Sequence, residues 1–181
     1  MPRFVALLRG VNVGKANRVP MAAFKAILES LGYTGVGTLL NSGNGLFTST
    51  SRSQVKHAAS IAAELQQRLG VTSPVIVKSA TELSEIINAS PLNPPEADHS
   101  KYLVTFAAEA EALQALEPLQ ELAQGTECFV VTKVAAFLYC PVGVLHSRVG
   151  EALLGKAGKR VTTRNWATVR KLHALAVARV A

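Results

Sequence analysis

The sequence contains little cysteine and no long apolar run, which argues against a disulfide-rich protein, a zinc protein and a membrane-spanning protein. Its two cysteines, Cys128 and Cys140, are too few for a disulfide framework and lack the spacing of zinc ligands. No stretch approaches the ~20 apolar residues of a membrane-spanning helix. The short apolar run after Arg3 lacks the cleavage site of a signal peptide. We therefore predict a cytoplasmic protein outside the membrane, with reduced thiols, no metal and no cofactor.

Acidic residues are absent from both ends of the chain. Residues 1–28 hold five basic residues and residues 152–181 hold seven, whereas all twelve acids lie between these segments, beside seven basic residues. If the ends meet in the fold, the net charge of +7 is concentrated on a positive surface that attracts anions. The alternative is a scattered basic surface that serves only solubility.

Aromatic residues are also few, at 6% of the chain. Sheets that read RNA stack bases on paired aromatic side chains. Here the first predicted strand offers only Phe4 and the third only Phe47, so base reading on a sheet face is disfavoured. Contact between basic side chains and nucleic-acid phosphates stays open.

The apolar pattern predicts an α+β subdomain over residues 1–90. Short apolar runs predict strands at residues 3–8, 36–40, 45–49 and 74–78. Pro20 and Ser51 are the expected helix starts. The second helix should bury one stripe of side chains, namely Val55, Ala58, Ala62, Leu65 and Leu69. The order strand–helix–strand–strand–helix–strand is the ferredoxin-like arrangement.

A second subdomain is expected over residues 91–181, because the proline-rich segment 91–95 cannot continue a helix or strand. A strand at 102–106, a helix at 108–116 and a hairpin about Lys133 repeat the order strand–helix–strand–strand. After Val144 the pattern predicts only helices.

The first candidate site is the glycine-rich loop that follows the first strand. Its glycines allow backbone N–H groups to approach a ligand, and its basic side chains favour an anion. Ala16 stands where a nucleotide-hydrolysing P-loop has Ser or Thr, so that chemistry is disfavoured. A tight turn without a ligand is the alternative. The candidate ligand-binding residues of the loop are Arg9, Gly10, Asn12, Gly14, Lys15 and Asn17.

Two further polar segments complete the candidate site. Ser42, Gly43 and Asn44 form a turn, and no flanking pattern supports Ser42 as a nucleophile. Near the C-terminus, Thr163 or Asn165 can cap a helix that buries Trp166, Val169 and Leu172. Arg164 beside that helix start favours a negatively charged ligand. Turn chemistry, a core position for Trp166 and a surface ion pair for Arg164 are the alternatives.

Three motifs resemble a known family when they are taken together. They are LLRGVNVG at residues 7–14, NSGN at residues 41–44 with Phe47, and TTRNW at residues 162–166 with Thr168. In order and spacing they are similar to the bacterial family of unknown function DUF1697, over nearly the whole chain. The resemblance implies a cytoplasmic bacterial protein with an α+β fold of ferredoxin-like character, and it implies no activity, substrate or cofactor.

Our leading hypothesis is a binding protein for an anionic ligand, either nucleic acid or a phosphorylated small molecule, held by these three segments. An enzyme for a small phosphorylated or carboxylated substrate is a second hypothesis, although the motifs contain no Asp, Glu, His or Cys for acid–base catalysis. A module that binds other proteins is a third, and it predicts an exposed apolar patch.

Overall fold

The computed structural model describes residues 1–178, so Arg179, one of the basic residues of the C-terminal segment, lies outside the described part. Two compact units make up the chain: Met1–Leu83 with the residues from Leu172 onward, and Ser84–Lys171. Helices α3 (Ala80–Asn88) and α6 (Trp166–Val177) each contribute residues to both units. The division into α+β subdomains over residues 1–90 and 91–181 stays a prediction. No helix within residues 1–178 is both long and apolar enough to cross a membrane.

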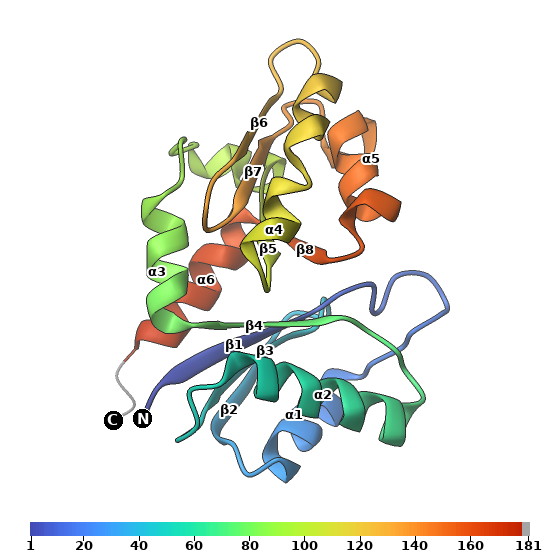
Figure 1. Ribbon diagram of the computed structural model, residues 1–181, viewed down its shortest axis with the longest axis vertical. Helices are drawn as coiled ribbons and strands as arrows, with labels where there is room; N and C mark the ends of the chain where they lie inside the picture. Colours follow the sequence, from blue (N-terminus) through green and yellow to red (C-terminus); the bar gives the residue numbers. More distant parts are fainter. Residues whose placement is uncertain (179–181) are drawn as a thin grey trace. The chain divides into compact units, whose positions relative to one another are not determined.

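The first unit contains a four-stranded antiparallel sheet, with α1 and α2 on one of its faces (Figure 1). The strand order is β2-β3-β1-β4, so β1 is an inner strand. Residues 4–8 of β1 are each at most 1% exposed, which explains their unbroken apolar run. The elements are β1 (Arg3–Leu8), α1 (Met21–Ser30), β2 (Thr34–Leu39), β3 (Asn44–Thr48), α2 (Gln54–Leu69) and β4 (Val75–Ser79).

Helix α2 buries most of the predicted stripe but not Val55, because Leu65 is buried and Ala58 and Leu69 pack against the core. Val55 is 79% exposed, whereas His57, Ile61 and Leu65 are buried. The four-residue spacing of these three places them on one face, and Val55 lies about 200° away from His57 around the helix. The predicted cap was also wrong. Ser53 rather than Ser51 caps the helix, and its side chain accepts a hydrogen bond from the Lys56 N–H at 3.3 Å.

Strand β2 lies at one edge of this sheet and pairs irregularly with β3. The register shifts between Thr34 and Gly37, and Gly35 has a φ of +58°. A positive φ disfavours residues with a side chain, so Gly35 suits this irregularity.

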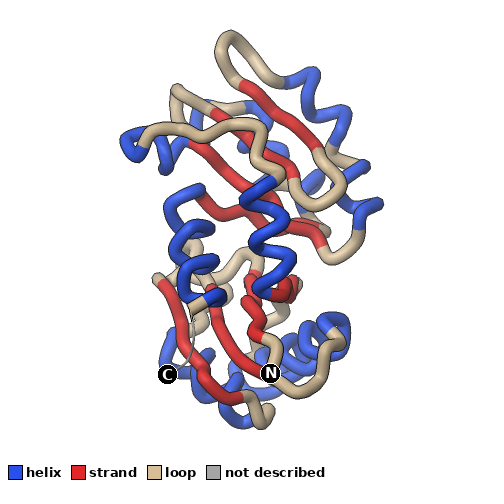
Figure 2. Tube along the Cα trace, turned by 90° about the vertical axis from the view of Figure 1, so that its left-hand side faces the viewer, coloured by secondary structure: helices blue, strands red, loops and turns tan. Residues whose placement is uncertain are grey.

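The second unit contains another four-stranded antiparallel sheet, in the order β6-β7-β5-β8. Figure 2 colours the strands of the protein red and its helices blue. Helices α4 and α5 pack on one face of it, through Leu113, Val149 and Leu153. The predicted α+β class is therefore confirmed by two antiparallel sheets and their helices. The elements are β5 (Tyr102–Ala107), α4 (Ala110–Gln114), β6 (Cys128–Val131), β7 (Ala136–Tyr139), α5 (Arg148–Leu154), β8 (Val161–Asn165) and the start of α6, with 3₁₀ helices η1 (Glu96–Lys101), η2 (Glu117–Leu122), η3 (Val144–His146) and η4 (Lys156–Gly158).

Strand β8 corrects the prediction that only helices follow Val144. It pairs with β5 in antiparallel register, with Thr105 opposite Thr163. The segment is polar, with two threonines, an arginine and an asparagine, so it lacks the apolar pattern of a buried strand. Pairing with a distant strand decides its conformation, which local sequence does not reveal.

Both cysteine thiols are free, and they differ in environment. Cys128 is exposed, whereas Cys140 is buried and its thiol donates to the Lys101 carbonyl at 3.3 Å. Burial raises the pKa of the Cys140 thiol to about 11. At neutral pH this thiol is therefore protonated and a poor nucleophile.

The close approach of α1 to β3 predicts that Gly45→Ala destabilises the protein. A Cβ at Gly45 would lie 2.8 Å from Leu28 Cδ1 and 2.9 Å from Phe24 Cε1. Because such overpacking typically costs ~1–3 kcal/mol, the free energy of unfolding measured in urea should fall by about that amount.

Gly37→Ala is the matched control, because a Cβ at Gly37 meets nothing within 4 Å. It should change stability by less than ~0.5 kcal/mol. Equal effects of the two substitutions would contradict the packing argument.

Candidate functional site

The loop after β1 alternates left-handed residues with ordinary ones. Gly10, Asn12 and Gly14 have φ values of +67°, +57° and +67°, and Asn17 follows at +52°. Left-handed residues at alternating positions turn successive backbone N–H groups toward one side. Among the described residues, the N–H groups of Gly10, Val13, Gly14 and Lys15 donate no hydrogen bond.

The Asn12 side chain holds this loop in place. Its Nδ2 donates to the Val19 carbonyl at 2.8 Å and to the Asn41 carbonyl at 2.7 Å. Its Oδ1 accepts from the Val19 N–H at 2.8 Å, and its own N–H donates to the Asn17 carbonyl at 3.0 Å. Both amide hydrogens are therefore used within the protein. This assigns Asn12 to positioning the loop.

The turn between β2 and β3 lies against the same loop. The Leu8 N–H donates to the Gly43 carbonyl at 2.9 Å. Gly43 has a φ of +81°, and a Cβ there would lie 2.7 Å from Leu8 Cβ and 2.8 Å from Val11 Cγ2. Only glycine suits this place. The buried Asn44 amide donates to the Leu39 carbonyl at 3.0 Å. The first unit thus brings together the first two predicted segments.

The charged side chains of the loop differ in exposure. Lys15 and Arg18 are exposed, and neither makes an ion pair within the described part of the chain. Arg9 is half-buried, and burial lowers the pKa of its guanidinium from the ordinary value. Arg9, Ser42 and Asn44 all have interaction partners in the chain. Sequence reasoning left out Arg18, although it belongs to the acid-free N-terminal segment.

The third predicted segment lies in the second unit, where Thr163 and Arg164 belong to β8 rather than to a helix start. The Thr163 hydroxyl hydrogen-bonds that of Thr105 at 2.9 Å. Asn165 caps α6, because its Oδ1 accepts from the Thr168 N–H at 2.9 Å. The polar side chains of Thr163 and Asn165 therefore have structural partners.

Arg164 is buried although it carries a charge. Its Nη1 donates to the Thr162 hydroxyl at 2.7 Å and to the Thr163 carbonyl at 3.0 Å. Burial lowers the pKa of its guanidinium to about 10, so the group is still charged at neutral pH. It borders a cavity of about 230 Å³ whose walls include Leu103, Val144 and Leu153.

Trp166 is the first residue of α6, and its side chain lies in the core, which was the alternative to a role in ligand binding. The side chain is 3% exposed, and its ring lies 5.2 Å from that of Tyr102. Its indole Nε1 is buried and has no hydrogen-bond partner among the described residues. The buried positions of Val169 and Leu172 confirm the predicted face of this helix.

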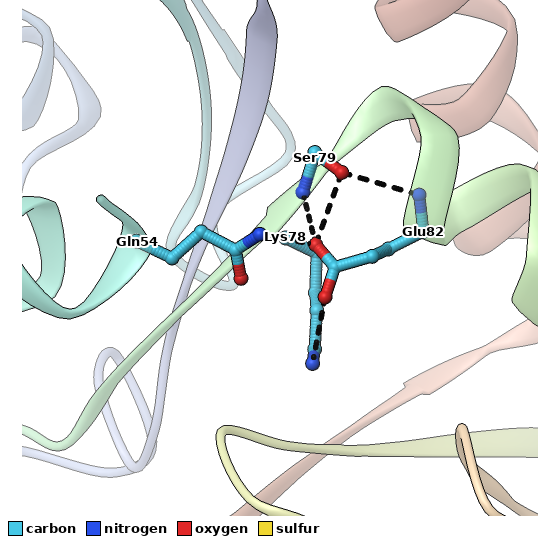
Figure 3. Close-up of polar contacts among 4 residues, drawn as sticks. All are labelled: Gln54, Lys78, Ser79 and Glu82. Carbon is cyan, nitrogen blue, oxygen red and sulfur yellow. Dashed lines mark hydrogen bonds and ion pairs between the residues drawn. The ribbon is translucent and has the colours of Figure 1, made fainter. Parts of the chain in front are cut away.

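A cluster of polar side chains at the start of α3 was not predicted (Figure 3). Glu82 Oε2 accepts from the N–H and hydroxyl of Ser79, at 2.8 and 3.0 Å, and from Gln54 Nε2 at 2.5 Å. The Glu82 N–H donates to Ser79 Oγ at 3.2 Å. This reciprocal pair is a capping box, so Ser79 caps the helix. The sequence signal was Ser followed three residues later by Glu.

The same carboxylate pairs with Lys78, whose Nζ lies 3.5 Å from Glu82 Oε1. Lys78 is only 8% exposed, so Glu82 both caps a helix and balances a buried ammonium group. These contacts give Glu82 a structural role.

His57 is likewise accounted for by structure. Its Nε2 donates to the Ser51 carbonyl at 3.0 Å, which leaves Nδ1 to accept from the Tyr33 hydroxyl at 2.7 Å. Phe4 and Phe47 surround the ring, at centroid distances of 5.0 and 5.2 Å. Within residues 1–178, no group of three or more His, Cys, Asp or Glu side chains could hold a metal ion.

Asn12→Asp tests the positioning role of the asparagine. The carboxylate keeps the size of the side chain but turns both donors into acceptors that face the Val19 and Asn41 carbonyls. Because unsatisfied buried polar groups cost ~1–3 kcal/mol, we expect a loss of stability of that size in urea unfolding.

The control is Asn17→Asp, which makes the same charge change in the same loop. Asn17 is exposed, and among residues 1–178 its side chain makes a single hydrogen bond, to the Gly10 carbonyl at 3.5 Å. It should cost less than ~0.5 kcal/mol. A stable Asn12→Asp protein would refute the positioning role.

Glu82→Ala should lower stability by ~1–3 kcal/mol, because it removes the cap and leaves Lys78 unbalanced. In a Lys78→Met background the same substitution should cost less, since no buried charge is then left alone. Thermal unfolding of the four proteins of this cycle measures the difference. Glu85→Ala, on the exposed side of α3, is the control. Equal costs in both backgrounds would show that the ion pair contributes nothing.

Comparison with known proteins supports a family assignment and a fold. Residues 1–137 match the family described as "Protein of unknown function (DUF1697)". No curated protein matches the chain. Among solved structures, the conserved bacterial protein SP0830 from Streptococcus pneumoniae superposes with a TM-score of 0.76 at 23% sequence identity, covering 97% of this chain and 98% of that one. At this identity the likeness concerns the fold alone.

Proposed function

We propose, from the premise that the chain belongs to the DUF1697 family of unknown function, that the protein binds a small anionic ligand through the loop after β1. The observation that carries the proposal is the loop itself. It has left-handed residues at positions 10, 12 and 14, and the backbone N–H groups of Gly10, Val13, Gly14 and Lys15 donate to no described residue. Such N–H groups bind anions when they converge.

Charge supports the same assignment. Lys15 and Arg18 extend from the loop, and residues 1–28 contain no carboxylate. The cations are therefore not neutralised by acids nearby in sequence. Asn12 fixes the loop before any ligand arrives, which lowers the entropic cost of binding.

Phosphate is the anion that fits these donors best, since backbone N–H groups with Lys and Arg are its usual partners. A phosphorylated small molecule is therefore the preferred ligand class. A nucleic acid would use the same phosphate contacts, and its affinity would fall steeply with salt. In this proposal the residues that touch the anion are Gly10, Gly14, Lys15 and Arg18.

The experiment is a titration of the ¹⁵N-labelled protein with inorganic phosphate, followed by NMR. The amide resonances of Gly10, Gly14 and Lys15 should shift, and Lys15→Gln with Arg18→Gln should weaken binding roughly tenfold, because charge-assisted hydrogen bonds are lost. A short single-stranded oligonucleotide in a salt series tests the nucleic-acid version.

Arg52→Gln with Lys56→Gln is the matched control, because it removes two exposed charges from the same unit outside the loop. It should leave phosphate binding unchanged. If the loop pair and the control pair of substitutions weaken phosphate binding equally, the effect is general charge attraction. If the amide resonances of the loop do not shift, the proposal is wrong.

We also infer two broader assignments. The first unit is of ferredoxin-like type, supported by the element order β1-α1-β2-β3-α2-β4 and the antiparallel sheet order β2-β3-β1-β4. The protein is cytoplasmic, an assignment supported by two free cysteines, because thiols stay reduced in that compartment.

A further inference from the structure

A polar groove lies in the second unit, and none of the predicted site residues lines it. Its volume is about 760 Å³, within the range of small-molecule sites. One wall comes from η1 and the residue stretch before it, and the other comes from α6. The polar lining residues are Asn93, Glu96, His99, Ser100, Arg170 and Lys171.

The helical spacing explains why these side chains share one groove. Glu96 and His99 are three residues apart in a 3₁₀ helix, where side chains with that spacing eclipse each other. On α6, Ala167 lies three and four residues before Arg170 and Lys171, so all three lie on one face. The small Ala167 side chain leaves space between the two walls.

Within residues 1–178, no ion pair balances the charges in the groove. Among the described residues, Glu96, His99, Arg170 and Lys171 take part in no ion pair. The neighbouring acid, Asp98, is already engaged, because it lies 3.7 Å from Lys101 Nζ and accepts from the Tyr139 hydroxyl at 3.3 Å. Two permanent cations therefore face a single carboxylate.

We propose that this groove binds a phosphate monoester whose organic part carries hydroxyl groups. Arg170 and Lys171 bind the phosphate, with the Ser100 hydroxyl as a further donor. Glu96, Asn93 and His99 lie on the wall that meets the organic part, where carboxylate and amide oxygens accept hydrogen bonds from hydroxyl groups.

The two walls of the groove differ in charge, and this difference indicates the class of ligand. An inorganic anion needs only the cations, and Glu96 would repel it. A hydroxylated ester uses both walls, because the carboxylate then has a donor to accept from. The volume also exceeds what a phosphate ion alone would occupy, as expected for a ligand with an organic part.

The test uses inorganic phosphate, ribose 5-phosphate and ribose with the ¹⁵N-labelled full chain. Both phosphates should shift the amide resonances of His99, Ser100 and Arg170 in a saturable way, with ribose 5-phosphate the tighter ligand, and ribose should not. Arg170→Gln with Lys171→Gln should weaken binding of both phosphates at least about tenfold, or about 1.4 kcal/mol. Glu96→Gln should strengthen binding of inorganic phosphate and reduce the advantage of ribose 5-phosphate over it.

Lys156→Gln with Lys159→Gln is the matched control, since it removes two exposed charges from the same unit outside the groove. Circular dichroism and thermal unfolding verify that all variants fold. Absence of saturable shifts in the groove, or equal weakening by the control pair, would overturn the proposal. If Glu96→Gln leaves the ratio of the affinities for ribose 5-phosphate and inorganic phosphate unchanged, the claim that Glu96 binds the organic part of the ligand is wrong. Lys15→Gln with Arg18→Gln should leave groove binding intact, so failure here is distinct from failure of the loop proposal.

Discussion

The Asn12 amide is the interaction on which the arrangement of the N-terminal motif depends. One side chain joins its own loop to two other stretches of backbone: Val19, two residues before α1, and Asn41 in the turn between β2 and β3. Asparagine suits this position twice, because it tolerates a positive φ and offers both donors and an acceptor. Without it, the glycines of the loop would give the chain freedom instead of a fixed conformation. The first role of the motif is thus to fix the conformation of the loop, and this conformation leaves several backbone N–H groups without an acceptor among the described residues.

Many polar residues that suggest a ligand have partners inside the protein. Asn165 caps a helix, Thr163 bonds to Thr105, and Glu82 is shared between a cap and Lys78. Among the described residues, the loop after β1 has backbone N–H groups that donate no hydrogen bond, and the groove between η1 and α6 has charged side chains that form no ion pair. A polar group that already bonds within the protein is a poor candidate for a ligand contact. The ligand is therefore expected at the polar groups that lack such bonds, even when the motif residues are correctly identified.

The sequence predicted the α+β class and most elements of the first unit, because apolar runs, glycine stops and proline starts are local signals. It predicted the hairpin about Lys133 for the same reason. It missed β8, whose polar residues are held by pairing with β5, and it placed Val55 on the wrong face of α2. For the candidate site, it found the glycine-rich loop and the adjacent turn. It could not reveal that Asn12 uses its amide internally, nor that His99 and Arg170 line one groove, because both depend on contacts distant in sequence.

The irregular strand β2 has a consequence for behaviour at high concentration. A regular edge strand presents a continuous row of backbone donors and acceptors, onto which another chain can add a strand. The shifted register and the left-handed Gly35 interrupt that row at the outer side of the first sheet. A bend of this kind discourages growth of the sheet into fibrils, so the least regular strand of the unit also protects its solubility.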